Sequence, residues 1–223
     1  PKIFNAKIRR ELRKMASDLG DRLYKEGYKG VFCMDFLLDS DDGTPYLGEV
    51  NPRISGASPM TNLLTSHYGG VPLFLFHLLE YLDVDYDIDL RRIQNRWNEY
   101  DYWSQLVLKQ TEDKVRQLTH APKTGVWRMD KYGGIKFDRH DLDWTNVIDN
   151  DEAFYLQVYK EGDYTYKGAD LGIIVSRGRM QTEKRELRER AKMWTSAINA
   201  EFHGIEPQKV PVFPHDPYKS KLF

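Results

Sequence analysis

The chain has 223 residues, of which 40% are hydrophobic and 30% charged, and its formal net charge is -1. This composition predicts a folded protein of one or two domains, and the interspersed Lys, Arg, Asp and Glu exclude a basic stripe for nucleic acid. Cys33 is the single cysteine and the longest apolar run, 71–76, is too short to span a bilayer, so we expect a cytoplasmic protein without disulfides or a membrane partner.

The first predicted element is a helix that Asn5 caps and Gly27 ends. Apolar residues recur every three or four positions, which places them on one face: Ile8, Leu12, Met15, Leu19 and Leu23. The other face is rich in Lys and Arg, and we interpret it as solvated.

The segment 30–51 predicts a hairpin, because two apolar runs flank an acidic turn at 39–43. With Asp42 as the centre of the turn, Asp35 and Glu49 each lie seven residues away and therefore face each other. Asn51 follows Glu49 by two residues and shares its face. A two-residue loop at 42–43 is the alternative, and it would send the two carboxylates to opposite faces.

Two facing carboxylates repel each other unless a cation lies between them. The oxygens of Asp35, Glu49 and Asn51 suit magnesium, and Arg53 offers a guanidinium to a phosphate or a carboxylate. The alternative is that these residues are simply the solvent face of a strand. The acidic turn resembles a calcium loop, but its spacing does not match one, and we interpret it as a solvated turn.

The rest of the chain predicts two helices, a connector and then a region of strands closed by a helix. The helices are 59–68 and 71–82, the second of them buried, and the connector is 83–100. The predicted strands are 103–110, 125–129, 134–138, 154–161 and 171–176, followed by an amphipathic helix over 181–202 that turns Leu187, Ala191, Trp194 and Ile198 inward. After Gly204 the chain is rich in proline, which favours an extended tail.

The string Glu49-Val-Asn51-Pro-Arg53, with Asp35 fourteen residues before Glu49, resembles the metal-binding strands of the ATP-grasp superfamily. The likeness is closest to the biotin carboxylase and carbamoyl-phosphate synthetase branch, and the stretches 10–30 and 168–175 extend it. The resemblance implies that Asp35, Glu49 and Asn51 bind Mg²⁺ (or Mn²⁺) carrying ATP. It also implies that Arg53 contacts the substrate or an acyl phosphate and is the catalytic residue.

The same resemblance suggests further roles around this motif. Leu37 would line the adenine side of the pocket, and Ser55 and Gly56 would hold the substrate. Lys109 is a candidate for a second basic residue at the reacting centre, although a lysine that faces solvent is the plainer interpretation. Where biotin carboxylase has a glutamine and a glutamate, this chain has Ser55 and Ala57, which argues against carboxylation of biotin.

We therefore expect an α+β fold: the C-terminal part of an ATP-grasp domain, with an antiparallel sheet and flanking helices, and then a biotin-carboxylase-C-like β-meander with a helix. The expected boundaries are 1–84, a connector at 85–102, the second subdomain at 103–204 and the tail at 205–223. Because the chain begins at Pro1 and lacks the upstream nucleotide-binding elements, we expect it to need a missing N-terminal half and to be inactive alone.

The predicted activity joins a carboxylate to an amine through an acyl phosphate, with ATP and Mg²⁺ as cofactors. The small-molecule carboxylate and amine are the expected substrates, and self-association of the chain is left open. Two alternatives remain at this stage. One is a biotin-carboxylase-like or carbamoyl-phosphate-type enzyme, and the other is a non-catalytic binding or assembly module.

Overall fold

The computed structural model describes residues 4–56, 58–97, 99–100, 102–184 and 186–207. The chain divides into two compact units, residues 1–101 and 102–223, and each is described by itself. The chain contains helices as well as strands, and the strand pairs of its sheets are antiparallel, so the fold is α+β, as predicted. Within these described ranges, no helix has both the length and the apolar character needed to cross a membrane.

The first unit combines one hairpin with four helices. Its elements are α1 (Ala6–Lys25), β1 (Cys33–Leu38), β2 (Pro45–Asn51), α2 (Ser58–His67), α3 (Leu73–Tyr81) and α4 (Leu90–Trp97). The first helix forms as predicted, because the Asn5 side chain accepts a hydrogen bond from the Ile8 amide at 3.0 Å. Just past its end, Gly27 has a φ of +81°, a conformation that favours glycine.

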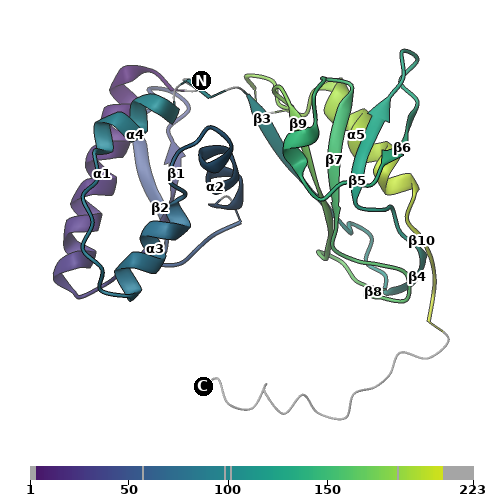
Figure 1. Cartoon of the computed structure of the whole chain (residues 1–223), viewed down its shortest axis with the longest axis horizontal. Helices are drawn as coiled ribbons and strands as arrows, with labels where there is room; N and C mark the ends of the chain where they lie inside the picture. The colour runs from purple at the N-terminus through teal and green to yellow at the C-terminus, as the bar shows by residue number, and fades with distance from the viewer. Residues whose placement is uncertain (1–3, 57, 98, 101, 185, 208–223) are drawn as a thin grey trace, which may run out of the picture. The chain divides into compact units, whose positions relative to one another are not determined.

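The helix α1 runs alongside the hairpin and packs near β2 (Figure 1). The buried positions among the described residues of this unit are Pro45, Asn62 and Thr65, so its large apolar side chains all keep some exposure. The predicted burial of the helix over 71–82 is therefore wrong, because Leu75, Leu78 and Leu82 are exposed. The first unit thus presents much apolar surface.

The predicted connector is only partly irregular, because it contains α4. The sequence Leu90–Trp97 has three apolar side chains, Leu90, Ile93 and Trp97, among polar and basic neighbours. Their spacing of three and four residues is that of one helix face, so this helix could have been predicted from the sequence. At the start of α4 the Asp89 carboxylate accepts a hydrogen bond from the Arg92 amide at 2.9 Å, which is an ordinary helix cap.

The second unit is built around a five-stranded sheet with the order β3-β9-β7-β5-β6, and a smaller sheet has the order β10-β4-β8. The bounds of its elements are β3 (Trp103–Lys109), β4 (Arg116–His120), β5 (Gly125–Met129), β6 (Ile135–Arg139), η1 (Trp144–Asn146), β7 (Glu152–Gln157), β8 (Tyr164–Thr165), β9 (Asp170–Arg177), α5 (Glu189–Ala200) and β10 (His203–Ile205). Because β3 pairs with β9, the sheet is not the simple meander that was predicted.

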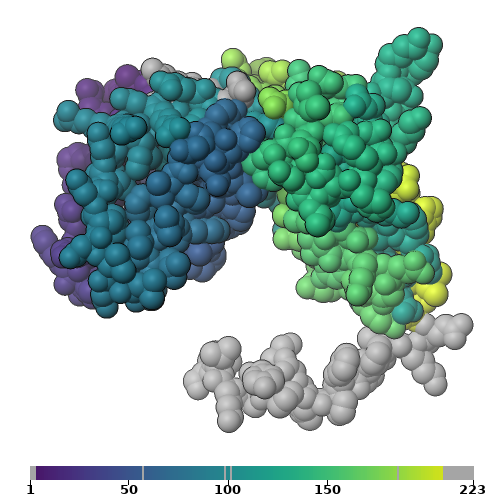
Figure 2. All heavy atoms as spheres, viewed as in Figure 1, coloured from purple at the N-terminus to yellow at the C-terminus, as the bar shows by residue number. Residues whose placement is uncertain are grey.

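The helix α5 covers one face of this sheet (Figure 1). Its inward residues Ala191, Trp194 and Ile198 are buried, as predicted, and they join Tyr155 and Ile174 in the hydrophobic core. The packed core therefore lies between the sheet and α5. On another side of the unit, the turn between β5 and β6 protrudes from its body (Figure 2).

The predicted start of the last helix is wrong by eight residues. The segment before Glu189 folds back on itself, since Gln181 forms a β-bridge with Leu187 and the Arg188 amide donates to the Met180 carbonyl at 2.9 Å. Leu187 consequently lies outside the helix and is partly exposed. The strand β10 ends at Ile205, the first residue of the predicted tail, and most of that tail, 208–223, lies outside the described residues.

Candidate functional site

The two acidic residues predicted to meet on the hairpin do lie opposite each other. Asp35 in β1 is the cross-strand partner of Glu49 in β2, and Cys33 is the partner of Asn51. Alternate residues of a strand share a face, so Asp35, Glu49 and Asn51 point to the same side of the sheet. Both carboxylates are exposed, which leaves them accessible to a ligand in water.

This register arises differently from the way it was predicted. Leu38 pairs with Pro45 and Phe36 with Leu47, so the loop spans 39–44 and its centre lies between Asp41 and Asp42. Continued regular pairing would place Asp35 opposite Gly48. A β-bulge between Asp35 and Phe36 leaves Gly48 without a partner and brings Glu49 opposite Asp35.

The acids of the turn hold its backbone. Asp39 accepts a hydrogen bond from the Asp41 amide at 2.8 Å, and Asp42 accepts one from the Thr44 amide at 2.7 Å. The hydrogen bonds from Thr44 lower the pKa of Asp42 below its ordinary value. These are the local contacts of an exposed turn, in agreement with its interpretation as solvated.

Asn51 and Arg53 continue the polar row that begins at Asp35. The Asn51 amide nitrogen donates to Asp35 Oδ2 at 3.2 Å, and its oxygen accepts from Arg53 Nη2 at 3.0 Å. Arg53 also donates to the Ile54 carbonyl at 3.2 Å, which holds its guanidinium beside the end of β2. The carboxylate, the amide and the guanidinium thus form one connected row.

The loop after Arg53 is held by serine hydroxyls. The Ser55 amide donates to Ser58 Oγ at 3.1 Å, and the two hydroxyl oxygens lie 3.3 Å apart at the start of α2. A side chain added at Gly56 would meet no atom within 4 Å, so a ligand has space to approach the backbone there. Ala57, which was predicted to replace a bicarbonate-handling residue, lies outside the described residues.

An apolar surface adjoins the two acids on the same face of the hairpin. Leu37 follows Asp35 by two residues and pairs with Tyr46, and the two residues are 67% and 55% exposed. Two exposed apolar side chains form only a small patch, which does not by itself mark a contact surface. Leu37 is nevertheless accessible, as its proposed contact with a nucleotide base requires.

The donor set fits a magnesium ion only as a partial site. No described group of three or more His, Cys, Asp or Glu residues is arranged to hold a metal. Two carboxylates and one amide supply few of the six oxygens that Mg²⁺ needs, and such sites are completed by waters and substrate phosphates. Asp35 and Glu49 have no ion-pair partner among the residues described, and the Arg53 guanidinium is linked to Asp35 only through Asn51.

Lys109 is placed at the surface of the second unit. Its Nζ lies 2.7 Å from Asp170 Oδ1, and both side chains are more than half exposed. Such exposed pairs contribute little to stability. The plainer interpretation of Lys109 as a strand lysine at the solvent face agrees with this placement.

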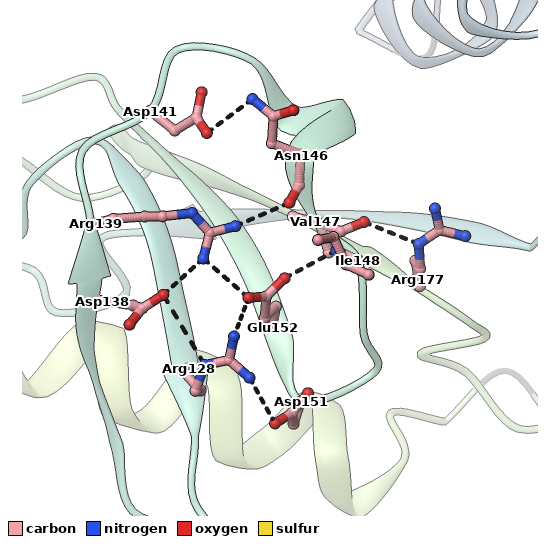
Figure 3. Close-up of polar contacts among 10 residues, drawn as sticks. All are labelled: Arg128, Asp138, Arg139, Asp141, Asn146, Val147, Ile148, Asp151, Glu152 and Arg177. Atoms are coloured by element: carbon pink, nitrogen blue, oxygen red, sulfur yellow. Dashed lines mark hydrogen bonds and ion pairs between the residues drawn. The ribbon is translucent and has the colours of Figure 1, made fainter.

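Figure 3 shows an ionic cluster around the buried Glu152 in the second unit, which no sequence pattern indicated. Glu152 is 1% exposed, and it accepts hydrogen bonds from Arg128 and, at 2.9 Å, from Arg139. Its other oxygen accepts from the Ile148 amide at 2.8 Å. The strand that contains Glu152 was predicted to begin at 154, which left this residue in a turn.

Two neighbouring acids complete this cluster. Arg128 also pairs with Asp151 at 3.1 Å, and Arg139 pairs with Asp138 at 2.6 Å. Burial alone would raise the pKa of Glu152, but the hydrogen bonds from Arg139 and Ile148 and the two cationic side chains outweigh it and lower that pKa. Because each charge has a partner inside the cluster, we interpret it as structural.

Comparison with known proteins adds no identification of this site. No model of a known protein family matches the sequence, and no curated protein matches it significantly. The arguments for its function therefore rest on the residues of the hairpin and on their geometry.

Proposed function

We propose that the open face of the β1–β2 hairpin binds a magnesium–nucleotide complex and that this chain is the C-terminal portion of an ATP-grasp carboxylate–amine ligase. The observation that carries the proposal is the pairing of Asp35 with Glu49, next to Asn51 and Arg53. Facing carboxylates without a balancing cation are unfavourable in an apo-protein, and a divalent cation would relieve that repulsion. The accessible Leu37 beside them supports a nucleotide base as the neighbouring ligand.

In the proposed reaction, a carboxylate oxygen attacks the terminal phosphorus of ATP, and the bond to ADP breaks. An amine then attacks the carbonyl carbon of the acyl phosphate, inorganic phosphate leaves and a C–N bond forms. Asp35, Glu49 and the oxygen of Asn51 would hold the metal ion, and the metal ion would neutralise the charge of the phosphates. Arg53 and the Ser55–Gly56 backbone would position the carboxylate. The leaving phosphate can take up the proton that the amine loses, so little protein acid–base chemistry is required.

We expect the chain to bind Mn²⁺, a paramagnetic substitute for Mg²⁺, together with ATP at this face. In ¹⁵N-labelled protein, Mn²⁺ with ATP should selectively broaden the amide signals of β1 and β2 around residues 35 and 49. Glu49→Gln should weaken Mn²⁺–ATP binding by about tenfold, or about 1.4 kcal/mol, because it removes one of two charged ligands. Titration followed by water-proton relaxation measures this affinity.

Asp41→Asn is the matched control, since it removes the same charge from the turn of the same hairpin. It should change the affinity by less than about twofold, as a distant exposed charge would. Equal weakening by both variants, or broadening that avoids residues 35 and 49, would refute the proposed site. For the activity, ADP release by the full-length protein, measured against carboxylates with and without an amine, should be lost in Glu49→Gln.

A further inference from the structure

A cavity lies within the first unit, lined by the end of α2, the start of α3, the segment 87–89 and α4. Its volume is about 350 Å³. Ligand pockets in proteins range from roughly 300 to 1,000 Å³, so this cavity suits a small molecule. One wall is apolar and aromatic, formed by Val71, Phe76, Ile93, Trp97 and Tyr100.

The charged residues at this cavity divide into those with a structural role and those without one. Asp89 caps α4 by accepting from the Arg92 amide, and Arg96 donates to the Tyr68 carbonyl at 2.6 Å. The side chains of Asp87 and Arg92 also line the cavity, but neither has a hydrogen-bond or ion-pair partner in the part of the chain that the structure describes. One carboxylate and one guanidinium therefore remain for a ligand.

The aromatic wall contains two further groups without partners. The indole N–H of Trp97 and the hydroxyl of Tyr100 are buried, and neither has a hydrogen-bond partner among the described residues. A buried polar group left without a partner costs about 1–3 kcal/mol. Because the surrounding protein shields both atoms from solvent, a ligand would contact the apolar faces of these rings rather than the N–H or the O–H.

We propose that this cavity binds a free amino acid with an apolar side chain. Arg92 would bind the α-carboxylate and Asp87 the α-ammonium group, while the side chain would pack against Ile93 and Trp97. A planar guanidinium suits a carboxylate, and the apolar wall offers an uncharged side chain its best contact. This site is separate from the hairpin residues, so it does not depend on the proposed ligase function.

The test uses three ligands that share a phenyl ring: phenylalanine, 3-phenylpropanoate and 2-phenylethylamine. Binding is followed by the NMR signal of the Trp97 indole N–H, which is assigned with Trp97→Phe. Phenylalanine should bind about tenfold more tightly than either analogue, because each analogue lacks one charged contact. Arg92→Gln should weaken phenylalanine and 3-phenylpropanoate about tenfold and leave 2-phenylethylamine unchanged, and Asp87→Asn should weaken phenylalanine and the amine and spare the acid.

Arg91→Gln and Asp85→Asn are the matched controls, because they change the same charges at neighbouring exposed positions that do not line the cavity. They should leave all three affinities unchanged. The proposal is overturned if the three ligands bind equally or if the controls act like the cavity variants. It is also overturned if the Trp97 signal does not shift with phenylalanine at about 10 mM, a concentration well above the dissociation constant of about 1 mM that is typical of weak binding.

Discussion

Replacing Glu152 with alanine is expected to destabilise the second unit by about 3 kcal/mol, because it removes the buried carboxylate that two partly exposed arginines share. Arg128 and Arg139 would keep Asp151 and Asp138, which places the loss at the low end for a broken buried ion pair. Urea denaturation of the full chain measures the loss, and hydrogen exchange of the β7 amides assigns it to this unit.

This contribution should also depend on pH. The pKa of folded Glu152 lies below its ordinary value, so its stabilising effect is complete above the pKa of the unfolded glutamate, about 4.3, and is lost as the pH falls from there through the lower folded pKa. The stability difference between the wild type and Glu152→Gln should therefore shrink in acid. Glu161→Gln, at an exposed position, is the control and should change stability little at any pH. A difference that stays constant down to about pH 2 would contradict the ionic origin.

Trp194→Ala is expected to destabilise the second unit by about 3–5 kcal/mol, the range for removing a buried aromatic side chain. Trp194 is 0% exposed and lies in the core between α5 and the sheet. Its indole N–H has no hydrogen-bond partner among the described residues, so the loss should come from packing alone. Thermal or urea unfolding followed by circular dichroism provides the measurement.

Two variants on the same helix separate packing from helix propensity. Trp194→Phe keeps an aromatic ring and gives up an unpartnered N–H, so it should cost about 1–2 kcal/mol. Lys192→Ala is exposed and should lie within about 0.5 kcal/mol of the wild type. If Trp194→Ala were no more destabilising than Lys192→Ala, the core would not be organised around this residue.

Local signals predicted the elements whose start and end depend on nearby residues. The Asn5 cap and Gly27 delimit α1, and the acidic turn predicts the hairpin. The pairing of Asp35 with Glu49 was also predicted, but for an incomplete reason. The predicted turn centre was half a residue too late, which shifts the pairing by one residue, and the unforeseen bulge shifts it by the same amount. The short sequence range of these contacts explains why they can be inferred without a structure.

Elements that depend on distant partners could not be predicted in this way. The segment 181–188 is rich in good helix formers, yet contacts such as the one between Arg188 and Met180 override that preference. The strands β4, β8 and β10 are short and pair across large sequence separations. Similarly, Glu152 reads as part of an acidic turn, and only its register opposite Arg128 shows why it is buried.

Because Gly48 has no cross-strand partner, substituting this residue and deleting it should affect the acidic pair in opposite ways. A Cβ at this position would lie 3.2 Å from the Asp35 carbonyl oxygen, so a bulky residue such as valine favours an unbulged ladder in which Glu49 changes sides. Deleting residue 48 instead makes Glu49 the direct successor of Leu47, and it still falls opposite Asp35. An alignment gap here would therefore preserve the acidic pair, whereas an innocuous-looking exchange of glycine for a larger residue would separate it.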